Sequence, residues 1–375
     1  MNLKNNFFKA ARIAVLGVVF FACENKNTDD PVGPGISEPA KYVVATTTNY
    51  AEGHLTVLKA GATVADTNRL SFSGDAFITS YEGSIYVIDR TRAVITKVIG
   101  AIMDTAHVDY QLNVGTGTNP QAIVFESLTR AYVLRYGSVY LLTFNPTTGE
   151  IVDSISLLSL VAHAGTENAA ALPRMSCAAV ANGKLYVACQ RLDDNWTVSD
   201  TSKVAVIGTG TNAIIKTINL VFKNPVDMHL SDSKLYISGV GSYGDPADGG
   251  LEEIDIAADT SVGGLISEAG LGGGSIGCFV VAGNKGYISL SNSSYENKMI
   301  PFRFDLHICY PALNFIYSLA TGQSLVYDGE YVYAAEASSA DPTGIVVVDP
   351  SDDAKVCGPI STGLAPYALT VLEVE

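Results

Sequence analysis

Positively charged side chains are scarce in this sequence. Its 375 residues include 23 Lys and Arg against 38 Asp and Glu, which gives a formal charge of −15 at pH 7. Proteins that bind nucleic acid neutralise phosphates with clustered Lys and Arg, so this balance argues against a nucleic-acid partner. It favours instead a soluble surface on which like charges oppose self-association.

The N-terminal apolar run, Ile13–Ala22, is too short to cross a membrane, because a spanning helix needs about 20 apolar residues. Lys4, Lys9 and Arg12 precede it. Basic residues followed by a short apolar run are typical of a targeting segment, which is excluded from fold reasoning.

The residues after this run suggest an anchor. Ala22-Cys23 resembles the end of a bacterial lipoprotein signal, although Phe20 and Phe21 stand where the usual motif has Leu and a small residue. An ordinary secretory signal is the alternative. Glu24–Pro39 is polar and rich in Pro and Gly, a composition that does not fold alone. The sequence therefore predicts a signal peptide (1–22), a flexible tether (23–40) and a folded domain (41–375). Cys23 would be lipidated, with palmitate among its acyl chains, and would anchor the domain in the outer membrane, facing the periplasm or the cell surface.

No CxxC motif occurs, so the sequence supports neither a redox dithiol nor haem attachment. Cys177 and Cys189 flank a predicted turn at Asn182-Gly183. A two-residue turn places the two sulfurs on opposite faces of the sheet, whereas a three-residue loop would permit a disulfide. We expect buried free thiols. Five cysteines follow Cys23: Cys177, Cys189, Cys278, Cys309 and Cys357. Because their number is odd, at least one of them is left unpaired if disulfides form only among them.

A four-strand pattern repeats along the chain. Residues 119–157 contain four short apolar runs (QAIVFE, RAYVLRY, SVYLLTFN, EIVDSISL) separated by turn-forming residues, which predicts a four-stranded antiparallel sheet. Third strands are expected to end at residues such as Asp89, Asn145 and Asp255. Each predicted second strand begins near an aromatic residue: Tyr42, Phe77, Tyr132, Tyr186, Tyr236, Tyr287 and Tyr333. These seven units of about 48 residues predict an all-β, seven-bladed β-propeller.

The two ends of the domain predict how the ring closes. The first unit begins at its second strand, KYVVATT, without an inner strand before it. Tyr367–Glu375 follows Ala365-Pro366 just as QAIVF follows Asn119-Pro120. The C-terminal strand should therefore complete the first blade and remove the open edge of the sheet.

The segments NPQAIVFES, RAYVLRYGS, NPTTGEIV, GKLYVACQ and SKVAVIG resemble the repeats of YVTN, or YncE-like, seven-bladed propellers. This resemblance implies an architecture rather than a function. With its signal, the plan is also similar to that of surface propeller lipoproteins that capture cobalamin or ferric siderophores beside TonB-dependent transporters. It implies a small-molecule ligand or an outer-membrane transporter as partner, in a nutrient-capture accessory to an uptake system.

Two groups of residues are candidates for a binding site. Long loops and the inter-blade connections Gly100–Asn119 and Leu158–Arg174 should gather on one rim, where loops commonly carry function. They supply rings and cations suited to a planar or anionic ligand or to a protein partner: Arg135, Tyr136, Arg191, Trp196, Tyr243 and Tyr295. The mouth of the central channel should carry the polar residues that open the inner strands: Gln121, Asp227, Gln323 and Tyr367. Packing of the loops and binding of channel water are the alternatives. We expect Arg135 and Arg191 to lie beside the site.

A metal site is a weaker hypothesis. His107 and Asp109 are placed in one inter-blade loop and His163 and Glu167 in the next, on the same rim. His and carboxylates suit zinc or iron, but the sequence cannot show that they converge.

No cofactor and no catalytic residue is predicted. The leading interpretation is a non-enzymatic scaffold that binds a ligand or a protein. The alternatives are a metal-assisted lyase or hydrolase and a structural or adhesive surface protein.

Overall fold

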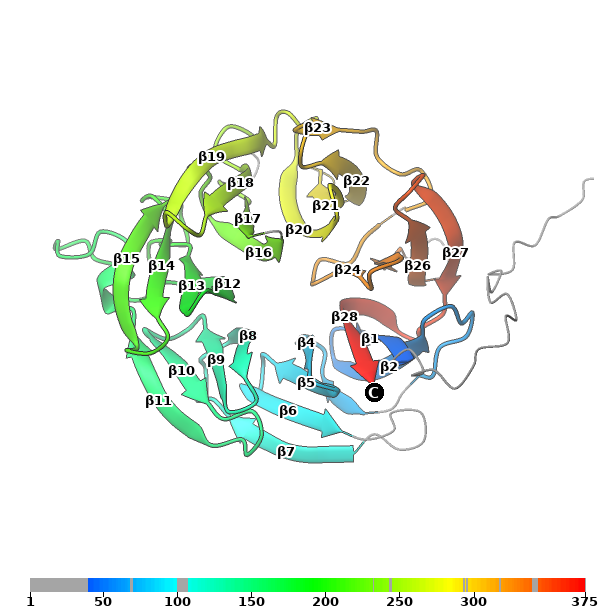
Figure 1. Ribbon diagram of the computed structural model, residues 1–375, viewed down its shortest axis with the longest axis horizontal. Coiled ribbons are helices and arrows are strands. Elements are labelled where there is room, and N and C mark those ends of the chain that lie inside the picture. Colours follow the sequence, from blue (N-terminus) through cyan, green and yellow to red (C-terminus); the bar gives the residue numbers. More distant parts are fainter. Residues whose placement is uncertain are drawn as a thin grey trace, which may run out of the picture.

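The chain forms a ring of seven antiparallel β-sheets around a central axis (Figure 1). The computed structural model describes residues 40–67, 70–99, 107–231, 233–242, 245–292, 294, 296–316, 318–338 and 343–374. Each sheet has four strands and forms one blade. The architecture confirms the predicted seven-bladed propeller. The predicted signal, Cys23 and nearly all of the tether lie outside the described residues.

The strands of blades 1 to 4 follow one another from the axis outwards. Blade 1 is β28 (Ala365–Val374), β1 (Ala40–Thr48), β2 (Glu52–Lys59) and β3 (Ser71–Ser73). Blade 2 is β4 (Ala76–Tyr81), β5 (Ser84–Asp89), β6 (Val94–Ile99) and β7 (His107–Asn113). Blade 3 is β8 (Pro120–Ser127), β9 (Arg130–Arg135), β10 (Tyr140–Phe144) and β11 (Ile151–Ser156). Blade 4 is β12 (Met175–Ala181), β13 (Lys184–Cys189), β14 (Lys203–Gly208) and β15 (Ala213–Asn219).

The remaining blades repeat this order. Blade 5 is β16 (Pro225–Ser231), β17 (Lys234–Gly239), β18 (Gly250–Asp255) and β19 (Thr260–Ser267). Blade 6 is β20 (Ser275–Ala282), β21 (Lys285–Ser291), β22 (Asn297–Arg303) and β23 (Ile308–Cys309). Blade 7 is β24 (Leu325–Tyr327), β25 (Val332–Glu336), β26 (Gly344–Asp349) and β27 (Ala354–Ile360). The short 3₁₀ turn η1 (Leu158–Leu160) connects blades 3 and 4. Within these described ranges, no helix has the length and apolar character needed to cross a membrane.

The C-terminal strand closes the ring, as predicted. Strand β28 is the inner strand of blade 1 and pairs with β1 from Ala40↔Val374 to Thr48↔Ala365. On its other side, the Leu369 N–H donates to the Gln323 carbonyl of blade 7 at 2.8 Å. The first and last blades are thus joined through one strand.

The core lies between blades rather than within one sheet. Along β13, Leu185 and Val187 belong to the apolar cluster between blades 3 and 4, whereas Tyr186 belongs to the cluster between blades 4 and 5. Because both faces of a blade are covered, second and third strands such as β13, β14, β25 and β26 are buried almost continuously and read as apolar runs.

The two predicted thiols on blade 4 follow the same rule. Cys177 packs in the cluster toward blade 5 and Cys189 in the cluster toward blade 3. The intervening turn has two residues, since Ala181 pairs with Lys184, and both cysteines are free. The prediction of buried free thiols on opposite faces is confirmed for this pair.

Two second-strand tyrosines, Tyr186 and Tyr287, bond to a carboxylate of the next blade, whereas Tyr132 and Tyr333 bond to Glu126 and Asp328 of their own blades. The Tyr186 hydroxyl donates to Asp259 of blade 5 at 2.6 Å, and Lys184 pairs with the same carboxylate at 2.7 Å. Blade 6 repeats this arrangement toward blade 7 through Tyr287, Lys285 and Asp353. The recurring aromatic residue therefore has a structural cause, because a buried hydroxyl needs a partner.

The sequence assignment of blade 2 is wrong by one strand. Phe77 lies in the inner strand β4, and the second-strand tyrosine is Tyr86, whose hydroxyl donates to the Pro146 carbonyl of blade 3 at 3.3 Å. Asp89 ends the second strand rather than the third. Strand β7 occupies part of the expected connection 100–119, so only residues 114–119 join blades 2 and 3.

The ring has two unlike faces. The loop face is the side where inner strands begin; it carries the connections between blades and the loops between second and third strands, such as residues 190–202. The turn face is the opposite side, with tight turns such as Asn182-Gly183. Loops such as residues 190–202 gather on one rim as predicted, but the long connection between β2 and β3 lies on the turn face. His107 and Asp109 also depart from the prediction, because they lie at the turn-face end of β7.

Removing the hydroxyl that links two blades should destabilise the fold. We expect Tyr186→Phe and Tyr287→Phe each to lower the free energy of unfolding by about 1–2 kcal/mol, since each loses a hydrogen bond to a carboxylate. Urea unfolding followed by circular dichroism measures the change. Tyr140→Phe is the matched control, because this tyrosine is 47% exposed. Equal stability of all three variants would contradict the structural role of the tyrosines.

Candidate functional site

A cavity of about 520 Å³ lies on the axis and opens at the loop face. All seven blades contribute to its wall, and we call it the channel cavity. The four predicted mouth residues, Gln121, Asp227, Gln323 and Tyr367, all line it, as does Tyr136. The polar lining that the sequence interpretation did not select includes Arg90, Gln190, Ser275, Ser289, Asn297 and Thr321.

Side-chain contacts join blades 1, 2 and 3 around this mouth. The Tyr367 hydroxyl donates to Asp75 at 3.3 Å, and Arg90 forms an ion pair with the same carboxylate at 3.1 Å. Arg90 Nε also donates to the Asn119 side chain at 3.3 Å, and Gln121 Nε2 does so at 3.0 Å. The Arg90 charge is therefore compensated within the scaffold.

The contacts continue through blades 3, 4 and 5. The Tyr136 hydroxyl donates to Gln190 Oε1 at 2.5 Å, and Gln190 Nε2 donates to the Pro225 carbonyl at 3.0 Å. One glutamine thus fixes the inner strand of the next blade. Because its amide is used at both ends, Gln190 positions the wall more than it offers groups to a ligand.

Asp227 and His229 form the acid–base pair of the cavity. His229 Nε2 lies 3.1 Å from Asp227 Oδ2, which also accepts the Phe279 N–H of blade 6 at 3.0 Å. Burial lowers the pKa of His229, but the Asp227 carboxylate outweighs it, and the pKa is raised above 6.5. The ring is enclosed by the cavity wall, although 35% of its side-chain surface stays accessible from the cavity. The Asp227 carboxylate therefore favours the protonated form of this histidine.

Two thiols line the cavity on either side of Asp227. Burial, together with the Asp227 charge, raises the pKa of Cys278 to about 11 and that of Cys177 further. Cys278 Sγ lies 3.0 Å from Ser324 Oγ, which connects blades 6 and 7. Since the thiolate is the nucleophile, these protonated cysteines are poorly suited to covalent catalysis.

The two arginines predicted beside the site belong to the scaffold. Arg135 donates to the Tyr140 carbonyl at 2.9 Å and to the Val114 carbonyl at 3.1 Å. Arg191 is 4% exposed, donates to the Leu160 carbonyl at 3.3 Å and pairs with Asp200. Neither lines the channel cavity.

The Arg191–Asp200 pair fixes the long loop of blade 4. Burial raises the pKa of Asp200, but hydrogen bonds from the His163 N–H and from Arg191 hold that pKa at about 2. The carboxylate therefore stays charged at any physiological pH, and the loop remains tied to the blade 3–4 connection.

A different arginine, Arg174, lies with the predicted aromatic residues. Its guanidinium carbon is 4.1 Å from the Trp196 ring centroid and 5.4 Å from that of Tyr136, and the two rings stack at 6.0 Å. Trp196 is 59% exposed. Sequence reasoning missed Arg174, although the residue ends a connection that it had placed on this rim.

The histidines proposed for a metal are not brought together. Asp109 pairs with Lys97 at 3.0 Å on the outer strand of blade 2, while His163 on the loop face contacts Ser199 at 3.1 Å. Across the described part of the chain, no group of three or more His, Cys, Asp or Glu residues could hold a metal ion. Tyr243 and Tyr295 lie outside the described residues.

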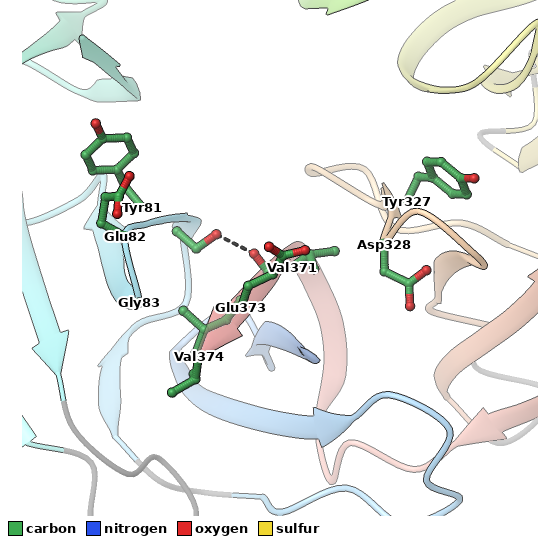
Figure 2. A pocket seen from close by; sticks show the side chains of 10 residues that line it. Tyr81, Glu82, Gly83, Tyr327, Asp328, Val371, Glu373 and Val374 are labelled. Carbon is green, nitrogen blue, oxygen red and sulfur yellow. Dashed lines mark hydrogen bonds between the residues drawn. The ribbon is translucent and has the colours of Figure 1, made fainter. Parts of the chain in front are cut away.

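A second cavity, of about 790 Å³, lies at the turn face between blades 1, 2 and 7. Figure 2 shows Tyr81 and Glu82 on one side of it, Tyr327 and Asp328 on the other, and the end of β28 between them. Its one dashed contact runs from Ser80 to the Val371 carbonyl. The carboxylates here are spread rather than convergent, and Lys41 compensates Glu373 at 3.4 Å. The channel cavity is the better candidate site.

Comparisons with known proteins support the fold. No protein-family model and no curated protein matches the sequence. Solved propellers do match: a proposed 6-phosphogluconolactonase from Bacteroides fragilis has a TM-score of 0.61 at 12% identity, over 90% of this chain and 99% of that one. A similar protein from Bacteroides uniformis has a TM-score of 0.62 at 9% identity, over 89% and 99%. AztD from Citrobacter koseri has a TM-score of 0.55 at 13% identity, over 90% and 99%. At such identities the likeness shows the fold alone.

Removing the carboxylate beside His229 should lower the pKa of this histidine. In Asp227→Asn the attraction between the carboxylate and the protonated His229 ring is lost, while the burial of the ring remains. The titration midpoint of His229 should therefore fall. Ring resonances followed by NMR, assigned with His229→Gln, measure it. A raised folded-state pKa stabilises the fold below about pH 6.5, and this stabilisation is lost as pH rises through the folded pKa.

The matched control is Asp75→Asn, which changes another carboxylate of the mouth without touching His229. Its midpoint should equal that of the unmodified protein. An unshifted midpoint in Asp227→Asn would contradict the assigned pairing.

Proposed function

We propose that this protein is an exported, lipid-anchored propeller that binds a small polar molecule in the channel cavity without transforming it. The observation that carries the proposal is the convergence of polar side chains from all seven blades on one cavity. Its volume of about 520 Å³ falls within the range of about 300–1,000 Å³ typical of ligand pockets.

One polar atom of the wall lacks a partner. Gln323 Oε1 is buried and accepts no hydrogen bond from the described residues. A buried acceptor without a donor is costly, and a ligand or water that donates to it would remove that cost. Gln323 was also among the mouth residues predicted from the sequence.

The chemistry of the cavity favours binding over catalysis. Its thiols are protonated, and the Asp227 carboxylate already accepts from His229 and from the N–H groups of Met228 and Phe279. A general base must instead reach a substrate proton. The enzyme alternative therefore rests on the Asp227–His229 pair alone.

The anchor proposed at Cys23 suits a capture role. Strand β1 begins at Ala40, which pairs with Val374 on the turn face. A tether from this point would leave the domain on the side opposite the channel cavity, so the cavity would face away from the membrane. A cavity that faces away from the membrane is open to ligands outside it, and the flexible tether proposed at 23–40 would let the domain turn toward an outer-membrane transporter.

Ligand screening tests the binding role. The purified protein is screened by thermal shift and calorimetry against cobalamin, haem, siderophores and small polar metabolites. For any ligand found, Gln323→Leu should weaken binding about tenfold by removing a buried acceptor, without lowering stability. Tyr81→Phe, in the turn-face cavity, is the control. Unchanged affinity in Gln323→Leu would place the ligand elsewhere, and turnover of a bound compound would favour the enzyme.

Fatty-acid labelling tests the anchor. Cells expressing the full chain are given a clickable palmitate analogue, and membranes are separated from the soluble fraction. The unmodified protein should be labelled and sediment with membranes, whereas Cys23→Ser should be unlabelled and soluble. Cys309→Ser is the control and should behave like the unmodified protein. Label retained in Cys23→Ser would refute the anchor.

A further inference from the structure

Arg174 occupies a position that blades 3, 4 and 5 share. In each blade the residue just before the inner strand has a left-handed backbone, with φ of 46° at Asn119, 59° at Arg174 and 55° at Asn224. In each, its carbonyl accepts the first N–H after the second strand, at 3.0–3.2 Å, from Tyr136, Gln190 and Val240 respectively. Asn tolerates this conformation better than Arg, because its short polar side chain can bond locally. The scaffold therefore prefers Asn here, and Arg is the exception.

A second arginine departs from the same motif. The second residue after the second strand is Gly241 in blade 5 and Arg191 in blade 4. Both have a positive φ, of 59° and 57° respectively. Arg191 has a structural use for its charge, because it pairs with Asp200 and binds the Leu160 carbonyl. The exception at Arg191 is explained by the fixed loop.

The charge of Arg174 has no such use. Arg174 is 7% exposed, its Nε is buried without a hydrogen bond, and its guanidinium makes neither an ion pair nor a hydrogen bond with any residue in the described ranges. Its contacts are the faces of Trp196 and Tyr136. Among the described residues its charge is therefore met by aromatic rings alone, whereas a buried charge is normally paired with an opposite charge.

Of the two rings beside Arg174, Trp196 is exposed and Tyr136 lines the channel cavity. Trp196 is 59% exposed and has a φ of 66°, which is unusual for a bulky residue. Its turn is held by Asp193, which accepts the N–H groups of Asn195 and Thr197 at 2.9 and 3.0 Å. Tyr136 stacks on Trp196 and also lines the wall of the channel cavity. We call the Trp196 and Tyr136 rings the shelf.

We propose that Arg174 and Trp196, which lie beside the channel cavity and contact Tyr136 in its wall, form with Tyr136 a recognition edge at the cavity mouth for a small anion that carries an aromatic ring. The acid group binds the guanidinium, which suits carboxylates through its paired N–H donors, and the ring stacks on Trp196. This inference rests on the proposed binding function and names its ligand class.

Three probes separate charge from ring: benzoate, benzamide, which lacks the charge, and cyclohexanecarboxylate, which lacks the aromatic ring. Trp196 is the single tryptophan of the chain, so its fluorescence reports binding at the shelf directly, and calorimetry gives the affinity. Benzoate should bind about tenfold more tightly than either other probe, the difference expected for one charged or stacking contact. Equal affinities, or unchanged fluorescence with all three probes, would overturn the inference.

The decisive variant is Arg174→Asn, which installs the residue that blades 3 and 5 carry at this position. It should weaken benzoate about tenfold while raising, or at least not lowering, the midpoint of thermal unfolding. A lower midpoint with benzoate affinity retained would show that Arg174 only packs the loop, against the inference. Arg174→Lys, which keeps the charge but not the paired donors, should bind benzoate with intermediate affinity, and full affinity in that variant would also count against it.

Different results would refute the proposed cavity binding and the proposed recognition of an aromatic anion. A ligand whose affinity depends on Gln323 but not on Arg174 would leave cavity binding standing and remove the anion edge. Arg135→Met is the matched control for loss of a loop-face arginine, and benzoate affinity should be unchanged in it.

Discussion

Pairing between β28 and β1 is the constraint on which the ring depends. Strand β1 lies between two apolar clusters, with Val43 packed toward blade 7 and Val44 toward blade 2. Without β28 its inner edge would be open, and Leu369 would no longer bind Gln323 of blade 7. Open strand edges are free to pair with other chains. Closure therefore protects two inter-blade cores and fixes the last polar contact around the channel cavity.

The same closure creates the cavity. Seven inner strands cannot meet at the axis, and the space between them is bordered by polar side chains that bond from blade to blade. Tyr367, Arg90 and Gln190 are all used in this way. Such groups define the wall, whereas Gln323 Oε1, a wall atom that accepts no hydrogen bond from the described residues, would be the one to receive a hydrogen bond from a bound molecule. Scaffold and recognition roles thus separate by whether a polar group is already satisfied.

Local signals determined how much the sequence could predict. Turn chemistry and apolar runs gave the blade number, the closing strand and the mouth residues Gln121, Asp227, Gln323 and Tyr367, which one cavity gathers. Blade 2 was misassigned because β4 and β5 are both short apolar runs, and the exposed outer strand β7 reads as a polar loop. The sequence could not predict which arginine forms an ion pair, because nothing in it distinguishes Arg191 from Arg174. Only the fold places Asp200 beside Arg191.

Ring closure also bears on how the chain reaches its folded state. The inner strand of blade 1 is contributed by residues 365–374, while its neighbour is contributed by residues 40–48. A chain that emerges from the N-terminus can form blades 2 to 7 in order, yet blade 1 stays incomplete until the last strand is delivered. Contacts so distant in sequence form slowly because loop closure carries an entropic cost. Until β28 pairs with it, the open edge of β1 is therefore the exposed surface on which a chaperone or an identical chain would act.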